Sequence, residues 1–205
     1  LLPEQAMAEA HAVDYWAPLM SLPHLADSSD DTLGYLTPYL RPDPSRLPVW
    51  AERLAALPPG RKIGLIWSGN PLNGNNPTRS LPHAELAALA AVGNVQWISL
   101  QMGSEGQRRP PAGLHWQAWG SELRDFADTA AILSQLDLLI TTDTGPAHLA
   151  GALRIPSWIL VQQVPDWRWG LSGEQCDSYP SLRVFRQARQ GEWGPVVQQV
   201  VAALG

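Results

Sequence analysis

From residue 61 onward, short continuous runs of hydrophobic residues alternate with longer segments in which apolar residues recur at helical spacing. A continuous apolar run is typical of a strand that is buried on both faces of a parallel sheet. We therefore predict five strands, at 62–68, 95–101, 137–143, 157–162 and 182–187. The segments between and after them predict helices at 83–92, 125–136, 145–153 and 194–204. This alternation indicates an α/β fold, a Rossmann-like parallel sheet with helices on both faces.

Residues 1–60 have a different pattern, with nine prolines and little sustained periodicity. Because each proline fixes its own φ and restricts the preceding residue, the stretch 37–48 predicts an extended linker. One short helix is predicted at Val49–Leu57 and ends before a Pro-Pro-Gly sequence. We expect 1–60 to be a Pro-rich interdomain linker or extension that packs on a domain formed by 61–205.

Composition narrows the classes of partner. The 205 residues carry a formal net charge of −5 and only 16% charged residues, without the basic patch that nucleic-acid binding requires. The single cysteine, Cys176, excludes an internal disulfide framework and suits a reducing cytosol. No apolar run reaches the roughly 20 residues that a membrane span needs. We therefore expect no nucleic-acid partner, no membrane span and a cytoplasmic location, with a peripheral position at the inner membrane as the alternative.

The N-terminal sequence LLPEQAMAEA contains two acids and no Lys or Arg, so it does not have the pattern of a signal peptide. The chain also begins without methionine, and we expect it to be a piece of a longer protein. Ten tryptophans in such a piece suggest that part of its apolar surface faces a missing partner.

The segment ITTDTGPAHLAGAL (140–153) carries the sharpest candidate chemistry. Its strand ends at Asp143, Thr144 and Gly145 form a turn, and the proline that follows suits the first position of a helix. The first N–H groups of that helix and its dipole attract anions, so the turn predicts a diphosphate site. His148, one turn into the helix, would face the same pocket. The alternative is an ordinary helix cap at Thr144 or Gly145, with His148 packed among its neighbours.

The loop after the first predicted strand provides a second group of candidates, Ser68, Gly69 and Asn70. Further along this loop, Arg79 precedes the next helix, where its guanidinium fork would reach a phosphate. The alternative is a surface arginine on a flexible loop. The loop is not a Walker motif, because the required Lys and Ser/Thr are missing, and GxGxxG does not occur either.

After the second predicted strand, Gln101 and Glu105 are candidates to accept hydrogen bonds from ribose hydroxyls, with solvated loop residues as the alternative for each. The five histidines have no HExxH or other paired metal-ligand spacing, and no Asp-x-Asp pair occurs. The GxSxG nucleophile elbow is also missing from the sequence. We therefore expect no metal and no cofactor.

The sequence Asp143-Thr144-Gly145-x-x-His148-Leu149, followed by Ala152-Leu153, resembles the C-terminal-domain signature of the heptosyltransferase family, glycosyltransferase family 9. Trp67-Ser68-Gly69, Arg79 before Leu81-Pro82, and Phe126-Ala127-Asp128-Thr129-Ala130 support this resemblance, which covers roughly residues 14–204. Pro165-Asp166-Trp167-Arg168-Trp169 resembles a subgroup often fused to tetratricopeptide repeats. The implied fold is the C-terminal half of a two-domain GT-B enzyme of bacterial type.

The resemblance implies that Thr144 and Gly145 hold the diphosphate of a nucleotide sugar, with His148 near the phosphates. Asp143 would contact sugar hydroxyls or fix the loop, and Glu105 matches a ribose-binding acid. Arg79 matches a basic position that neutralises the leaving diphosphate, whose stabilisation is a large part of catalysis. The implied donor is a nucleotide-diphospho-sugar, ADP-heptose or one carrying another hexose-like sugar, used without a metal.

In this family the acceptor site and the carboxylate base belong to an N-terminal domain, for which residues 1–60 are too short. We therefore expect no certain catalytic residue in this chain, with His148 and Arg79 as stabilisers of the leaving group. The expected partners are the nucleotide-sugar donor, the missing N-terminal acceptor domain, and a saccharide or protein acceptor.

Two other hypotheses remain open from the sequence. One is a non-catalytic nucleotide-sugar-binding or scaffold module left from a truncated or degenerate transferase. The other is an unrelated Rossmann-like oxidoreductase or phosphotransferase, against which the missing glycine fingerprints count.

Overall fold

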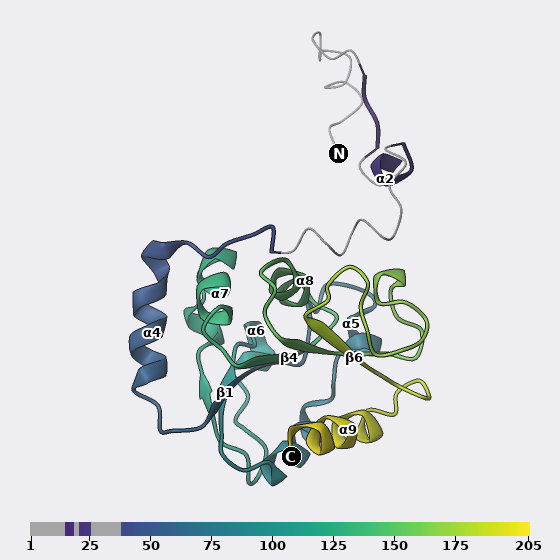
Figure 1. Cartoon of the computed structure of the whole chain (residues 1–205). Coiled ribbons are helices and arrows are strands. Elements are labelled where there is room, and N and C mark those ends of the chain that lie inside the picture. Colours follow the sequence, from purple (N-terminus) through teal and green to yellow (C-terminus); the bar gives the residue numbers. More distant parts are fainter. Residues whose placement is uncertain (1–14, 19–20, 26–37) are drawn as a thin grey trace.

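The computed structural model describes residues 15–18, 21–25 and 38–205, and a six-stranded sheet forms its centre (Figure 1). The strands are β1 (Arg61–Ile66), β2 (Val95–Ser99), β3 (Trp116–Ala118), β4 (Leu138–Thr142), β5 (Ser157–Val161) and β6 (Leu182–Arg186). Their order is β3-β2-β1-β4-β5-β6, and every neighbouring pair runs parallel. The predicted Rossmann-like parallel sheet is confirmed.

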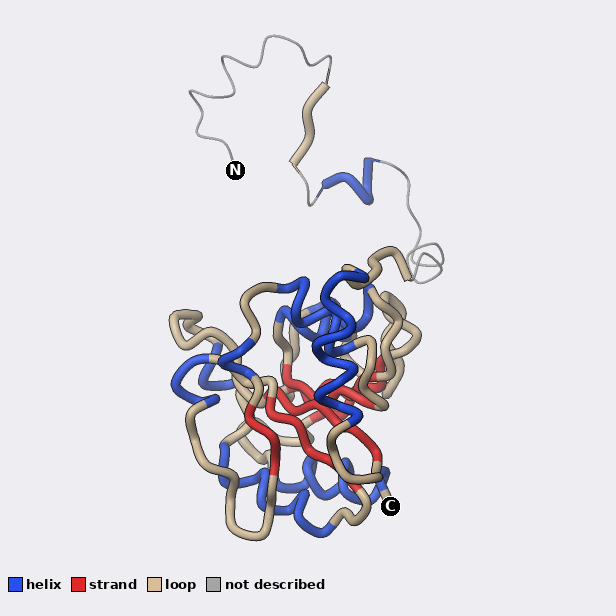
Figure 2. Tube along the Cα trace, turned by 90° about the vertical axis from the view of Figure 1, so that its left-hand side faces the viewer, coloured by secondary structure: helices blue, strands red, loops and turns tan. Residues whose placement is uncertain are grey.

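Helices cover both faces of the sheet, as predicted (Figures 1 and 2). One face carries α4 (Leu47–Ala55), α7 (Phe126–Leu133) and α8 (Gly145–Ala152), and the other carries η4 (His83–Ala91) and α9 (Gly194–Leu204). The shorter helices are α2 (Leu22–Leu25), η3 (Pro44–Arg46), α5 (Asn76–Arg79), α6 (Gly103–Gly106), η5 (Gly120–Glu122) and η6 (Trp167–Trp169).

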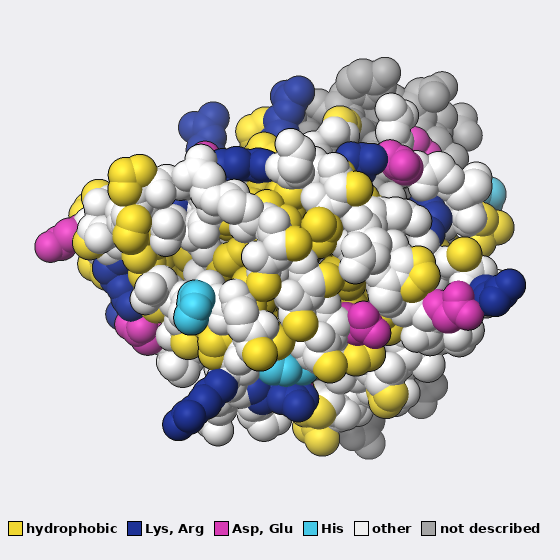
Figure 3. All heavy atoms as spheres, turned by 90° about the horizontal axis from the view of Figure 1, so that it is seen from below, with side chains coloured by type: hydrophobic (Ala, Val, Ile, Leu, Met, Phe, Trp, Pro, Cys, Tyr) yellow, Lys and Arg dark blue, Asp and Glu magenta, His cyan; other side chains and the backbone are white. Residues whose placement is uncertain are grey.

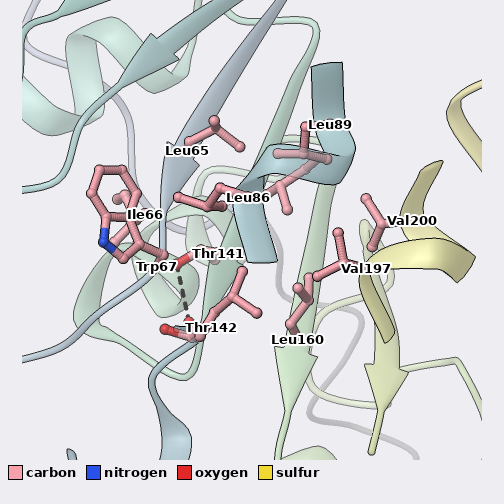
Figure 4. Close-up of a pocket in the computed structure, with 12 residues that line it drawn as sticks. Leu65, Ile66, Trp67, Leu86, Leu89, Thr141, Thr142, Leu160, Val197 and Val200 are labelled. Carbon is pink, nitrogen blue, oxygen red and sulfur yellow. Dashed lines mark hydrogen bonds between the residues drawn. The ribbon is translucent and has the colours of Figure 1, made fainter. Parts of the chain in front are cut away.

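Two hydrophobic cores hold these layers together. Leu86 and Leu89 of η4 pack with Val197 and Val200 of α9 on one face, and α4, α7 and α8 bury their apolar side chains on the other. Figure 4 shows the first core, where twelve residues line a cavity of about 10 Å³. A space of this size holds about one water molecule, so it is a packing gap and not a ligand site.

The structure departs from the predicted elements in several places. The stretch 37–48 was predicted to be an extended linker, but its second half is helical, in η3 and the start of α4. Pro44 and Pro48 stand in the first positions of these helices, where proline is tolerated. Strand β3 was not predicted, because it has three residues and only Trp116 among them is partly buried. The segment predicted as an ordinary helix at 83–92 forms the 3₁₀ helix η4. Its buried residues, Leu86 and Leu89, are three apart, which is the repeat of a 3₁₀ helix.

Residues 38–55 of the N-terminal extension contact the sheet domain through helix α4 and the irregular segment before it. Trp50 and Leu54 of α4 are buried against α7 and the sheet. Arg53 forms an ion pair with Glu122, with Nη2 and Oε1 2.8 Å apart. Upstream, the backbone N–H of Tyr39 donates to a carbonyl at the end of α8, 3.0 Å away. The domain boundary expected at residue 60 stays a prediction.

The strand order creates a switch point between β1 and β4. The chain leaves β1 toward β2 and β3 on one side, and leaves β4 toward β5 and β6 on the other. Connections that diverge in this way open a crevice at the carboxyl ends of the two central strands, where ligands of such sheets bind. The loops after β1 and β4 are therefore the first place to look for a site.

Candidate functional site

A cavity of about 560 Å³ lies at the switch point, within the size range of small-molecule sites. It is bounded by the loops after β1 and β2, the start of α7 and the start of α8. Of the ten predicted site residues, seven line it: Ser68, Gly69, Asn70, Arg79, Gln101, Thr144 and Gly145. The other three, Glu105, Asp143 and His148, lie outside this lining.

The start of α8 gives the cavity a backbone donor. Thr144 is the N-cap residue in an extended conformation, and its side chain makes no capping hydrogen bond. Its hydroxyl instead pairs with that of Thr141, with the two oxygens 3.0 Å apart. Pro146 has no N–H, and the N–H of Ala147 donates to the Thr144 carbonyl at 3.0 Å, so the Gly145 N–H is the group in these first helix positions that is left for a ligand. A side chain at Gly145 would lie 3.0 Å from the Phe126 ring, so glycine keeps this end of the helix open.

Arg79 supplies a positive charge at the same cavity. Among the described residues it has no acidic partner, and its Nε is buried without a hydrogen bond. A Cβ on Gly69 would lie 2.8 Å from the Arg79 Nη2 and 2.7 Å from the Asn76 Oδ1. The glycine therefore lets the guanidinium lie against the loop backbone. An arginine held in place without an internal anion is suited to bind an external one.

The Gln101 side chain forms its hydrogen bonds mainly with the loop after β1. Its Oε1 accepts from the backbone N–H groups of Trp67 and Ser68, at 3.0 and 2.9 Å. Its Nε2 donates to the carbonyls of Ser68 and Met102, at 3.0 and 3.1 Å. Both amide hydrogens are thus used inside the protein, and Gln101 fixes the loop that carries Ser68 and Gly69.

Glu105 turns away from the cavity toward an aromatic cluster. It accepts a hydrogen bond from the Trp67 indole at 3.2 Å and forms an ion pair with Arg108 at 3.2 Å. Trp67 itself is stacked on Trp116. The ribose-binding role expected for Glu105 stays a prediction, and in the structure this carboxylate is engaged by groups of its own chain.

Asp143 and His148 form a separate cluster beside the start of α8. The His148 Nε2 lies 4.0 Å from the Asp143 Oδ1, and its ring is stacked on Trp169 at 4.8 Å between centroids. Its Nδ1 lies 3.3 Å from the Tyr179 hydroxyl. Burial lowers the pKa of His148 below its usual value, so the imidazole is neutral near pH 7. Both residues stay close to the α8 terminus without lining the 560 Å³ cavity.

Several residues that line the cavity were not singled out as site residues in the sequence. Phe126 and Met102 are large apolar side chains that are more than half exposed, and both face this space. Asp125 also lines it, but it caps α7 and is paired with Arg46 at 3.1 Å. Among them, the sequence offered a signal only for Phe126, an aromatic residue that directly follows the N-cap aspartate of α7.

The charges around the cavity favour an anion. Asp125 is balanced by Arg46, and Arg124 is balanced by Asp128, whereas Arg79 has no such partner within the described ranges.

The described residues also include no group of three or more His, Cys, Asp or Glu that would hold a metal ion. On the face of the molecule in Figure 3, hydrophobic and neutral atoms cover the middle, and Lys and Arg side chains lie mainly toward the edges. In residues 15–18, 21–25 and 38–205, no helix is long and apolar enough to cross a membrane.

Comparison with known proteins finds relatives of the sequence and of the fold. No protein-family model matches the sequence. Protein FlbA of Caulobacter vibrioides is 30% identical over 198 residues, which are 93% of this chain and 33% of FlbA. The E. coli ADP-heptose lps heptosyltransferase II matches with a TM-score of 0.57 at 16% identity, over 80% of this chain and 52% of that one. The glycosyl transferase family 9 structure from Veillonella parvula DSM 2008 covers 72% of this chain and 42% of its own, with a TM-score of 0.49 at 15% identity.

The chain therefore spans a third of FlbA and about half of the E. coli heptosyltransferase. It shares the fold of the corresponding part of that enzyme, a parallel Rossmann-like sheet between two layers of helices.

Proposed function

We propose that this chain is the donor-binding half of a glycosyltransferase and that its 560 Å³ cavity takes the diphosphate of a nucleotide sugar. The observation that carries the proposal is that Arg79 and the start of α8 line the same cavity at the switch point of the sheet. A guanidinium without an internal partner and the unpaired N–H of Gly145 at the positive end of the helix both prefer an anion. The apolar faces of Phe126 and Met102 beside them suit the flat surface of a nucleobase.

The lining of the cavity suits an anion but, among the described residues, contains no unpaired carboxylate that could act as a general base. Its lining carboxylate, Asp125, already caps α7 and pairs with Arg46. A sugar transfer needs a group that accepts the proton of the acceptor hydroxyl. We therefore place the acceptor site and the base in another part of the protein, as in the N-terminal half of a GT-B enzyme. In this chain Arg79 and the α8 terminus would stabilise the leaving diphosphate.

The finer assignments belong to the same proposal. The E. coli neighbour is an ADP-heptose enzyme, which makes ADP-heptose the first donor to test. A transfer without a metal is part of the proposal and rests on the sequence resemblance. A saccharide or protein acceptor, a bacterial cytoplasmic setting and fusion to tetratricopeptide repeats rest on the sequence resemblance alone.

Calorimetric titration with ADP, UDP, GDP and ADP-heptose tests the proposal. We expect one nucleoside diphosphate to bind in preference to the others, and its monophosphate to bind more weakly because one phosphate contact is lost. Equal affinity for the diphosphate and the monophosphate would contradict a diphosphate site at the start of α8.

The second candidate is a binding or scaffold module without catalysis. It is favoured by the cavity lining, whose carboxylate, Asp125, is already paired with Arg46. Turnover distinguishes the two candidates, since only a transferase consumes ADP-heptose and releases ADP in the presence of an acceptor.

A further inference from the structure

A chain of polar contacts runs from the N-terminal extension to the start of α8. The Tyr39 and Tyr179 hydroxyls lie 3.5 Å apart, the Tyr179 hydroxyl lies 3.3 Å from the His148 Nδ1, and the His148 Nε2 lies 4.0 Å from the Asp143 Oδ1. These groups come from three separate parts of the sequence, so their alignment depends on the folded chain. The last member, Asp143, directly precedes the turn that begins α8.

We propose that Tyr179 is the positioning residue that holds His148 as an Nε2–H tautomer facing Asp143, and thereby fixes the anion-binding turn. This inference rests on the proposed nucleotide-diphosphate site. Tyr179 does not line the cavity, so it acts through His148 and not on the ligand.

The direction of the His148–Tyr179 hydrogen bond follows from the charge on the other side of the imidazole. The Asp143 carboxylate lies 4.0 Å from Nε2, too far for a hydrogen bond, but its negative charge favours the proton on this nearer nitrogen. The Nδ1 then carries a lone pair, and the Tyr179 hydroxyl must donate to it. Burial and the neighbouring Tyr39 raise the pKa of Tyr179, so its hydroxyl keeps the proton that this role needs.

The position of the Tyr179 ring is built into α8. A Cβ added to Gly151 would lie 2.3 Å from the Tyr179 Cγ, so the ring packs against the helix at a position that admits no side chain. His148, one turn earlier on the same helix, is stacked on Trp169, which restricts the rotation of the imidazole. Glycine in α8 and tryptophan in η6 thus bring the Tyr179 hydroxyl and His148 Nδ1 together.

The charged groups nearest to His148 are Asp143, Asp166 and Arg168, and the first two favour its protonated form while Arg168 opposes it. Burial outweighs the two carboxylates and lowers the pKa of His148. Tyr179 adds to this effect, because a donor to Nδ1 stabilises only the neutral ring. Loss of the hydroxyl should therefore raise the pKa of His148 and release the second tautomer.

The test is ¹⁵N NMR of histidine-labelled protein, with His148 assigned from a His148→Gln sample. We expect a dominant Nε2–H tautomer in the unaltered chain, and both tautomers together with a raised His148 pKa in Tyr179→Phe. Tyr15→Phe makes the same chemical change at a highly exposed site and should leave both readings unchanged. Gly151→Ala, which displaces the ring but keeps its hydroxyl, should act like Tyr179→Phe.

The same variants are then titrated with ADP, UDP and GDP. Loss of one neutral hydrogen bond predicts roughly a two- to tenfold weaker affinity in Tyr179→Phe for whichever nucleotide binds. An unchanged tautomer and pKa in Tyr179→Phe would overturn the assignment. A changed tautomer with unchanged affinity would overturn the link to the anion-binding turn. Because the tautomer is read without nucleotide, a failure of all three nucleotides to bind would count against the proposed function and not against the tautomer assignment.

Discussion

Replacement of Arg79 by alanine gives the sharpest quantitative prediction. Arg79 lines the cavity, and within the described residues it has no acidic partner. A hydrogen bond to a charged group contributes about 1.5–3 kcal/mol, more than a neutral one. At about 1.4 kcal/mol for each factor of ten, the variant should bind nucleoside diphosphate roughly 10- to 150-fold more weakly.

Isothermal titration calorimetry at fixed ionic strength measures this loss. The affinity of Arg79→Lys should lie between that of the unaltered chain and that of Arg79→Ala, because lysine keeps the charge but not the planar fork. Arg189→Ala is the matched control, since this arginine is 80% exposed, lies outside the cavity lining and has only a loose contact with Glu192 at 3.5 Å. The urea midpoint of Arg79→Ala should change little, because no internal ion pair is lost.

Two results would refute the reasoning about Arg79. An affinity within twofold of the unaltered chain would show that the guanidinium does not reach the ligand. An equal loss in Arg189→Ala would show that the effect comes from the overall charge of the protein, not from a contact in the cavity.

Three further predictions concern the groups that support the cavity. Gly69→Ala would crowd Arg79 and should weaken nucleotide binding as Arg79→Ala does, whereas Gly74→Ala, which enters open space, should not; equal affinities in the two glycine variants would contradict this. Gln101→Ala leaves two backbone N–H groups of the β1 loop without their acceptor and should lower the free energy of unfolding by about 2–4 kcal/mol, measured in urea. Hydrogen bonds from arginine hold the pKa of Asp128 well below its usual range of about 4, so its stabilising effect is present above pH 4 and is lost as the pH falls further. In Asp128→Asn the urea midpoint should therefore decrease less between pH 4 and lower pH than in the unaltered chain. An equal decrease in both proteins would count against a stabilising ion pair between Asp128 and Arg124.

The sheet could be predicted from the sequence because its strands are buried on both faces. In β4 all five residues are buried, and they are three aliphatic residues followed by two β-branched threonines, a composition typical of a buried strand. Strand β3 lies at the edge of the sheet, with two of its three residues exposed, and leaves no such signal. Prediction therefore succeeded where burial determines the residue type and failed where it does not.

The site could be located, but the directions of its side chains could not. Parallel strands end at one edge of the sheet, and the candidates Ser68 and Thr144, in the loops after β1 and β4, line one cavity there. Gln101 turns toward the β1 loop because two backbone N–H groups there need an acceptor. His148 turns toward Tyr179, which is 31 residues away in the sequence. Such partners are set by tertiary packing, and spacing along the chain does not reveal them.

The most direct test of the central claim locates the bound diphosphate on the protein. Backbone amide NMR shifts are recorded during titration with whichever of ADP, UDP or GDP binds, or with all three at high concentration. We predict that the largest shifts occur at Gly69 and Gly145, on the two sides of the 560 Å³ cavity. Shifts confined to the loop 167–178, which lines a separate pocket of about 440 Å³, or no shifts with any nucleotide, would contradict the account.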